Sequence, residues 1–531
     1  MEFKRSVFAS RLRLPVSFNH SQPPSFIEIV FEHTKILSLA SALIVMVDVP
    51  LEIWLRIASF IPDNDLYNLR GVSHMFFTLA MDAQWSRTRI SSDITWYKTL
   101  ERLSDPYVAR KVTNLSIYLT LDKSTVDDNS QLYKLLRSRF RSSHQTLANF
   151  FRIKPVELDR KETIRRCKLK DVIDVISASN GNFPNVRELS VDGCLFFSQG
   201  PTPLPILSPS FWLPFSNNLG SLSLGGTMEE FRFMLESGHT FSSLKQLQLR
   251  FEQSYDGEGD SSVLIDIIAP FINRMNRHLE DLMVWSRSDL DISDFFISLS
   301  SLSALRRFKV KMFYTRSLRN SAGLESIILN ASPHLEKLSI RHSSRSLGLG
   351  LESLDTLWDM PFSQWLLELI SNKEKFPRIQ ILDIYALYKP AGIHVFLDFI
   401  HKASDKLTEI IVRDRYLSPN EAMLVIGAAS HCSSLTYLRL TVRTLDIALI
   451  DCLADKVPGV RRIYLAIGEP NPHGSDVLEQ LQGQCYEHWK LQDISIWHLE
   501  GHQRMVDTLL ALARSVPSLR SFFGNGHMNL G

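Results

Sequence analysis

The sequence has little cysteine, little surplus charge and few residues in any one hydrophobic run. Its 531 residues include only five cysteines, which are spread singly, whereas disulfide frameworks and zinc sites need clustered, usually even-numbered cysteines. Lys and Arg number 59 against 57 Asp and Glu, so the net charge of +2 provides no chain-wide attraction to nucleic acid. We therefore expect reduced thiols, no metal site and no nucleic-acid partner.

Motifs for phosphate binding and catalysis are also missing. Gly348 and Gly350 lack the third glycine and the preceding strand of a dinucleotide-binding loop. The patterns G-x-x-x-x-G-K, H-E-x-x-H and G-x-S-x-G do not occur. Scattered Ser, His and Asp residues define no catalytic triad without geometry. We expect a protein that has neither catalytic residues nor a cofactor and that acts by binding.

Residues 1–45 contain prolines and serines in an irregular pattern, so we expect a poorly ordered leader. The apolar segment 36–47 is shorter than the roughly 20 residues that span a bilayer, and we expect no membrane span. It also lies too far from the N-terminus for an ordinary signal peptide. A membrane anchor, a packed leader, and a leader preceding a natural start at Met46 remain open as interpretations of this segment.

Three short helices are predicted between residues 49 and 80. Pro50 presets the backbone angle of a first helical turn, and apolar residues follow at helical spacing until Pro62 ends this helix. Asp63 or Asn64 can cap the next helix, and a third follows it. A unit of this size buries too little apolar surface to be stable by itself, so it should present an apolar face to a partner.

This helical segment resembles an F-box. The resemblance is carried by Pro50, Leu51, Glu52, Ile53, Ile57, Pro62, Asp65, Leu66, Leu69, Arg70, Val72, Phe76, Leu79 and Ala80. It implies that the helices bind a Skp-family adaptor and, through this adaptor, a cullin. The residues that it implies for adaptor binding are Pro50, Leu51, Ile53, Trp54, Ile57, Leu66, Leu69, Val72 and Phe76.

The rest of the chain repeats an apolar-x-x-apolar-x-apolar unit at a spacing near that of leucine-rich repeats. Its copies begin at Val186, Leu219, Leu244, Leu279, Leu305, Leu335, Ile379, Leu407, Leu435, Val460 and Leu491, and a degenerate copy at Val112 opens the array. Helix start signals lie between the copies, including a capping box at Thr227 and Glu230 and another at Ser418 and Glu421. Alternating strands and helices predict parallel strands joined by right-handed crossovers.

The repeats resemble the leucine-rich-repeat region of F-box proteins of the fungal type. The predicted fold class is α/β, with a short all-helical F-box followed by a curved solenoid in which neighbouring repeats share one core. We expect a leader at 1–45, the F-box at 46–90, a helical linker at 91–110 and the solenoid at 111–531. Within the solenoid, the insertions 196–218 and 252–262 should be loops.

Strand periodicity also predicts which side chains face the concave side of the solenoid, since they alternate with the core positions. Two adjacent repeats place basic residues there, and we predict that these contact an acidic or phosphorylated segment of a target: Arg307, Lys309, Lys311, Lys337 and Arg341. A mixed basic and aromatic surface continues through Tyr385, Arg413, Tyr437, Arg439 and Trp497. The alternative is that these residues form an ordinary solvated face.

The resemblance implies a function in cytoplasm or nucleus as the substrate-recognition subunit of an SCF-type (Skp-cullin-F-box) ubiquitin ligase. The F-box would dock on the adaptor, and the solenoid would hold a target protein whose identity the sequence does not reveal. The chain itself would be a non-catalytic adaptor, which acts by bringing the target close to a ubiquitin-charged enzyme. The alternative is a leucine-rich-repeat scaffold that binds a partner without any ligase.

Overall fold

The computed structural model describes residues 50–522, except for 92–95, 119–175, 177–182, 194–208, 237, 253–260, 288–289, 315–317, 343–359, 372–375, 385–389, 469–476 and 499–501. The expected leader, its apolar segment 36–47 and Tyr385 lie outside the described residues. The chain divides into two compact units, Met1–Ala83 and Gln84–Gly531.

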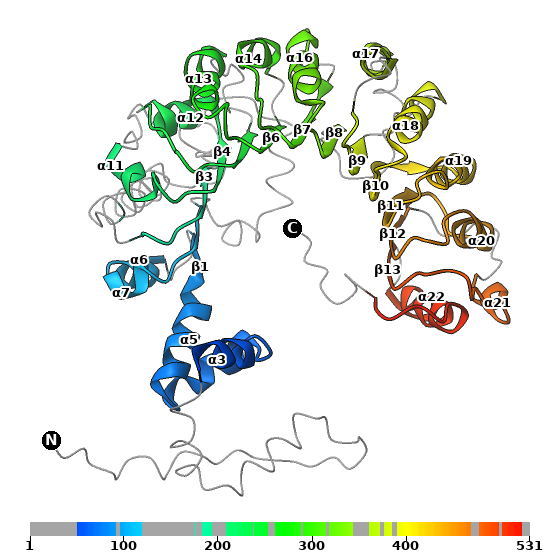
Figure 1. The fold of residues 1–531 in the computed structure, drawn as a ribbon, viewed down its shortest axis with the longest axis horizontal. Coiled ribbons are helices and arrows are strands. Elements are labelled where there is room, and N and C mark those ends of the chain that lie inside the picture. Colours follow the sequence, from blue (N-terminus) through cyan, green and yellow to red (C-terminus); the bar gives the residue numbers. More distant parts are fainter. Residues whose placement is uncertain are drawn as a thin grey trace, which may run out of the picture. The chain divides into compact units, whose positions relative to one another are not determined.

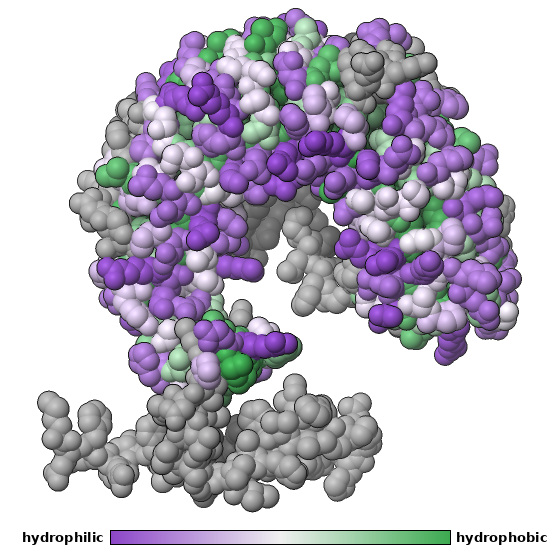
Figure 2. All heavy atoms as spheres, in the orientation of Figure 1, coloured by the Kyte–Doolittle hydropathy of each residue, from purple (hydrophilic) through white to green (hydrophobic). Residues whose placement is uncertain are grey.

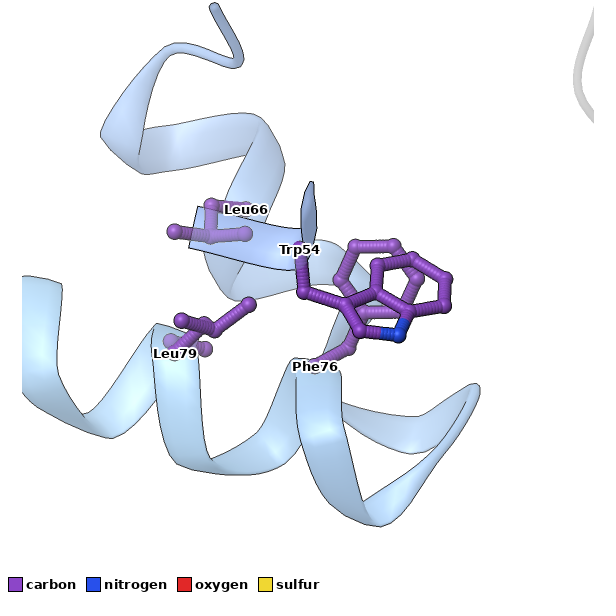
Figure 3. Close-up of a cluster of buried hydrophobic side chains, with 5 residues drawn as sticks. Trp54, Leu66, Phe76 and Leu79 are labelled. Carbon is purple, nitrogen blue, oxygen red and sulfur yellow. The ribbon is translucent and has the colours of Figure 1, made fainter. Parts of the chain in front are cut away.

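The first unit contains short helices, as predicted. These are α3 (Leu51–Ala58), α4 (Asp63–Asn68), the 3-10 turn η2 (Leu69–Gly71) and α5 (His74–Ser86), whose last three residues belong to the second unit. Pro50 and Pro62 are the N-cap residues of α3 and α4. Proline has no backbone N–H, and at this position the helix loses no hydrogen bond because of that. Their helices pack around a small core whose buried members are Trp54, Leu66, Phe76, Leu79 and Ala80 (Figure 3).

The second unit is built on a thirteen-stranded parallel sheet in which the strands follow one another in chain order. The strands are β1 (Arg87–Ser91), β2 (Asn114–Tyr118), β3 (Glu188–Gly193), β4 (Ser221–Gly226), β5 (Gln246–Phe251), β6 (Asp281–Ser286), β7 (Arg307–Met312), β8 (Lys337–His342), β9 (Ile381–Ile384), β10 (Glu409–Leu417), β11 (Tyr437–Val442), β12 (Arg462–Ile467) and β13 (Asp493–His498). This order confirms the prediction of parallel strands in a solenoid.

Helices connect the strands and lie on one side of the sheet. They are α6 (Trp96–Leu103), α7 (Pro106–Ala109), α11 (Pro209–Trp212), the 3-10 turn η5 (Leu213–Phe215), α12 (Met228–Leu235), the π-helical η6 (Leu264–Ile268), α13 (Ala269–Asn273), α14 (Ser293–Ser298), α16 (Ala322–Ala331), α17 (Met360–Ser371), α18 (Pro390–Ala403), α19 (Pro419–Ala429), α20 (Ile447–Lys456), α21 (Val477–Leu481) and α22 (His502–Ser515). In Figure 1 the strands follow the inner side of the curved second unit and the helices its outer side. We call the helix-free side of the sheet the strand face.

The core of the solenoid runs between strands and helices and is formed by the repeated apolar positions. Leu222, Leu247 and Leu282 stand opposite one another on β4, β5 and β6, and each is at most 1% exposed. Stacking of equivalent residues in this way lets each repeat bury an apolar face that it could not bury alone. The repeat pattern therefore identifies the core correctly.

The start of the sheet and one predicted loop differ from the prediction. The sheet starts with β1, inside the segment expected to be all helical, and α6 and α7 connect β1 to β2 rather than forming a separate linker. The predicted loop 196–218 contains α11 and η5, because the aromatic residues Phe211, Trp212 and Phe215 are fully buried against neighbouring repeats. The second predicted loop, 252–262, is described only at its ends.

Candidate functional site

The first unit exposes a large apolar surface. Helix α3 leaves Ile53, Leu55 and Ile57 between 40% and 51% exposed, and Phe60 just after it is 78% exposed. Tyr67, Val72 and Phe77 add exposed apolar side chains from the next helices. We call these seven residues the helical face, which contributes the hydrophobic surface that Figure 2 shows on this unit. So many exposed large apolar side chains on so small a unit typically mark a site of interaction.

The apolar side chains of helix α3 have two different tasks. Trp54 is 4% exposed and packs edge-to-face against Phe76, with ring centroids 5.1 Å apart and planes at 74°. Ile53 and Ile57 lie one turn apart beside Trp54 on the helix surface, and both are exposed to solvent. The inward side stabilises the unit, and the outward side is available for a partner.

The predicted adaptor-binding residues fall into these two groups. Pro50, Ile53, Ile57 and Val72 are exposed, and Leu69 is half-buried. In contrast, Trp54, Leu66 and Phe76 belong to the internal core and are at most 7% exposed, while the side chain of Leu51 lies outside the described part.

Sequence reasoning missed Leu55, Phe60, Tyr67 and Phe77 on the helical face. Helical spacing assigned apolar residues to a single stripe and could not separate an inward from an outward side. The position of Leu55 could have indicated an exposed apolar site. It lies outside the apolar stripe that faces the core, and a helical residue outside that stripe points toward solvent.

The structure brings the five predicted basic residues together on the strand face of β7 and β8. Arg307 stands opposite Lys337, and Lys311 stands opposite Arg341. Buried core positions alternate with these side chains along β7, as strand parity requires. Figure 2 shows strongly hydrophilic surface on the inner side of the second unit in this region.

An acidic residue partly neutralises this basic cluster. Asp281 on β6 accepts hydrogen bonds from Arg307 Nε at 2.9 Å and from Lys309 Nζ at 3.1 Å. Lys337 is half-buried and lies close to Lys309, and both the burial and the neighbouring charge lower the pKa of its ammonium group. The cluster is therefore a mixed network rather than a uniformly positive surface.

A second group of cations surrounds one tryptophan. The ring centroid of Trp285 on β6 lies 4.3 Å from Arg287 Cζ, 4.6 Å from Lys311 Nζ and 5.9 Å from Arg250 Cζ. Arg250 and Lys311 are the residues opposite Trp285 on the two neighbouring strands. We call these four residues the Trp285 patch.

Two carboxylates fix one side of the Trp285 patch. Arg250 forms an ion pair with Asp192 two strands away, and it also contacts Glu252 at 2.9 Å between Nε and Oε1. Arg287 lies 3.4 Å from the same oxygen of Glu252. Burial raises the pKa of the Glu252 carboxyl, and the charges of the two arginines oppose this shift.

Gly225 allows the long ion pair between β3 and β5 to form. It occupies the position between Asp192 and Arg250 on the intervening strand. A Cβ atom at Gly225 would lie 2.9 Å from Arg250 Nη2 and 3.0 Å from Asp192 Oδ1. A side chain at this position would require the guanidinium of Arg250 or the carboxylate of Asp192 to shift.

A further aromatic and cationic group lies on β11 and β12. Arg439 Cζ is 4.2 Å from the ring centroid of Tyr464, and Arg462 Cζ is 5.3 Å from that of Tyr437. The sequence had indicated Tyr437 and Arg439 but missed Arg462 and Tyr464, which belong to the next repeat.

The remaining predicted members of the mixed surface are separate from this group. Arg413 is paired with Asp383, a carboxylate that is almost fully buried. Trp497 is half-buried on β13.

Within the described residues, no group of three or more His, Cys, Asp or Glu side chains is arranged to hold a metal ion. The helices of that part of the chain all fall short of the length and apolar character needed to cross a membrane.

Comparisons with known proteins give a weak structural match and no sequence match. No family model matches the chain, and no curated protein matches it. A solved structure of a protein from Bacteroides fragilis is 13% identical, covers 58% of this chain and 83% of its own, and superposes with a TM-score of 0.35. The functional interpretation therefore rests on the residues of the chain itself.

Proposed function

We propose that the chain is the substrate-recognition subunit of an SCF-type ubiquitin ligase. The three helices of the first unit would bind a Skp-family adaptor and, through it, a cullin. The strand face of the solenoid would hold a target protein in the cytoplasm or nucleus. The chain would perform no chemistry itself, because holding a target lysine near a ubiquitin-charged enzyme raises its effective concentration.

The helical face is the observation that carries this proposal. Phe60, at 78% exposed, and its apolar neighbours stand on a unit whose own core has only a few buried side chains. Exposing such surface to water is unfavourable at roughly 25 cal/mol per Å², and a partner that covers it recovers that free energy. This agrees with the role that the F-box resemblance implies for the same segment.

The strand face supports the second half of the proposal. Trp, Tyr and Arg are the residue types that contribute most to protein interfaces, and they gather in the Trp285 patch and on β11 and β12. A parallel solenoid also offers one continuous surface from repeat to repeat, which suits an extended partner.

Adaptor capture by the full chain tests the proposal. We expect Ile53→Glu with Ile57→Glu to weaken capture of a purified Skp-family adaptor at least about tenfold, since charges replace two exposed contact residues. The fold should survive, because neither side chain belongs to the core around Trp54. Biolayer interferometry measures capture, and circular dichroism measures the fold.

The matched control places the same charges on exposed leucines of the solenoid, as Leu424→Glu with Leu510→Glu, which are 47% and 49% exposed. This variant should capture the adaptor like the wild type. Undiminished capture by the α3 variant, or no capture by the wild-type chain, would contradict the proposal. Target binding without adaptor capture would instead favour a repeat scaffold that works without a ligase.

A further inference from the structure

The Trp285 patch has the composition and placement of a recognition site. We infer that it binds an anionic side chain, carboxylate or phosphate, within an extended segment of the target protein, and that Trp285 is its aromatic anchor. This rests on the proposed role of the solenoid in holding a target. It deepens that role by giving the site a location on β5–β7 and a ligand chemistry.

The register of the sheet makes the patch compact. Trp285 is flanked directly by Arg250 on β5 and by Lys311 on β7, at the strand spacing of about 4.8 Å. Arg287 follows Trp285 by two residues, which returns it to the same side of the sheet, and its side chain is 49% exposed. A ligand on the strand face would therefore meet the ring and several cations at once.

The tryptophan ring also prepares its cations for binding. Contact with an aromatic face holds the long side chains of Arg287 and Lys311 near 4.3 Å and 4.6 Å from the ring centroid. Side chains that are already ordered lose less conformational entropy when a ligand arrives. The ring is half-buried, so it retains exposed surface against which a bound chain can pack.

Local charge selects an anion. The patch and the basic residues of β7 and β8 together contain seven Lys or Arg side chains, and three carboxylates are paired with them, Asp192, Glu252 and Asp281. The local excess is therefore four positive charges, whereas the whole chain has +2. A local excess of this size attracts anionic groups and guides their approach.

The carboxylates around the patch indicate which kind of anion fits. Asp192, Glu252 and Asp281 lie among the cations and hold Arg250, Arg287 and Arg307 through ion pairs. The continuous phosphate backbone of a nucleic acid would approach these carboxylates and be repelled. A peptide can place single acidic side chains at the cations and keep neutral residues near the carboxylates, so the pattern favours a protein segment.

Labelled synthetic peptides provide the probe, because the target is unidentified. We would use a short peptide in which Glu alternates with Ser, its phosphoserine form with Gln in place of Glu, and a neutral Gln and Ser form. Fluorescence anisotropy with the full chain at about 0.1 M and about 1 M salt measures affinity, since the screening length falls from about 10 Å to about 3 Å over this range. The Glu and phosphoserine peptides separate carboxylate from phosphate recognition.

We expect at least one anionic peptide to bind more tightly than the neutral peptide and to bind less tightly in high salt. Trp285→Ala, which changes no charge, should weaken that binding about tenfold, and Trp285→Phe should restore part of it. Arg287→Gln with Lys311→Gln should weaken it by at least the same factor. The midpoint of thermal unfolding identifies any variant that fails to fold. The peptide affinities of the variants that do fold then test the inference.

The matched control removes two positive charges from the same repeats outside the strand face. Lys245 and Arg306 precede β5 and β7 and form exposed ion pairs with Glu280 and Glu336. Lys245→Gln with Arg306→Gln should leave peptide affinity within about twofold of the wild type.

Equal losses in the control and the patch variants would overturn the inference, because the attraction would then be diffuse. Failure of both anionic peptides to bind better than the neutral peptide would also overturn it, as would tighter binding of a single-stranded oligonucleotide. The patch variants should capture the Skp-family adaptor normally. If the wild-type chain does not capture the adaptor, the proposed ligase role is contradicted, and the result for peptide binding still stands.

Discussion

Burial separates the three cysteines in the described part of the chain. Cys432 follows helix α19 and is buried, which raises the pKa of its thiol to about 11, and the charge of Asp405 adds to this shift. Burial also raises the pKa of Cys452 on α20, whereas Cys485 is exposed. Because the thiolate is the reactive form, the buried Cys432 should react more slowly than the partly exposed Cys452 and the exposed Cys485.

This difference predicts selective labelling. At pH 8 we expect iodoacetamide to modify Cys485 at least about a hundred times faster than Cys432, since a pKa of about 11 leaves roughly one thiolate per thousand. Site-resolved mass spectrometry of the labelled full chain measures both rates. Modification of Cys432 in the folded chain should accelerate about tenfold per pH unit toward pH 10. Similar rates for both thiols at pH 8 would contradict the expectation.

The sequence predicted which residues lie on the strand face, but it did not predict the ion pairs that these residues form. Strand parity placed Arg307 and Lys309 on one side of the sheet, where the structure has them. It could not show that both contact Asp281, because an ion pair between strands depends on register. Nor could it connect Asp192 to Arg250 across Gly225, since those residues belong to different repeats.

Whole elements were more predictable where the local sequence contains its own stop and start signals. The capping boxes at Thr227 and Ser418 are both present, so the predicted starts of α12 and α19 are confirmed. Strand β1 was missed because its five residues, RTRIS, contain one apolar side chain and no repeat unit. Tertiary pairing with β2 determines that strand, and local sequence does not reveal such pairing.

The contact between α14 and α16 depends on a glycine. A Cβ atom at Gly323 would lie 2.4 Å from the backbone nitrogen of Ile297 and 2.6 Å from the carbonyl carbon of Phe296. Backbone atoms cannot rotate away as the end of a side chain can. Gly427 in α19 has no atom within 4 Å of the equivalent position, so the two helical glycines form a matched pair.

We expect opposite effects from alanine at these two sites. Gly323→Ala should lower the free energy of unfolding by about 1–3 kcal/mol, because overpacking outweighs the gain of about 1 kcal/mol in helix propensity. Gly427→Ala should raise it by up to about 1 kcal/mol, since only the propensity changes. Urea unfolding of both variants measures these differences. A stabilised Gly323→Ala variant would show that α14 and α16 can separate without loss.

At the scale of the whole solenoid, each strand pairs only with its neighbours in the chain. Stability in such an array is the sum of the repeats and their interfaces, so damage should remain local. Leu247 is 1% exposed and lies between Leu222 and Leu282 in the stacked core. It is therefore a suitable place to test how far a defect spreads.

Leu247→Asp buries a charge in the apolar core and should lower local stability by about 3 kcal/mol or more. Hydrogen exchange followed by mass spectrometry should show lost protection in β4, β5 and β6. Strands β11 and β12 should keep the protection that they have in the wild-type chain. Uniform loss of protection from β1 to β13 would mean that the unit unfolds as one cooperative globule.

The consecutive strand order also has a consequence for synthesis. A chain that leaves the ribosome from its N-terminus releases each strand after the strand on which it must pair, from β1 through to β13. No strand has to wait for a distant C-terminal segment before it finds its neighbour. The solenoid can therefore lengthen repeat by repeat as it is translated, and the edge on which each new strand pairs is always that of the strand made just before it.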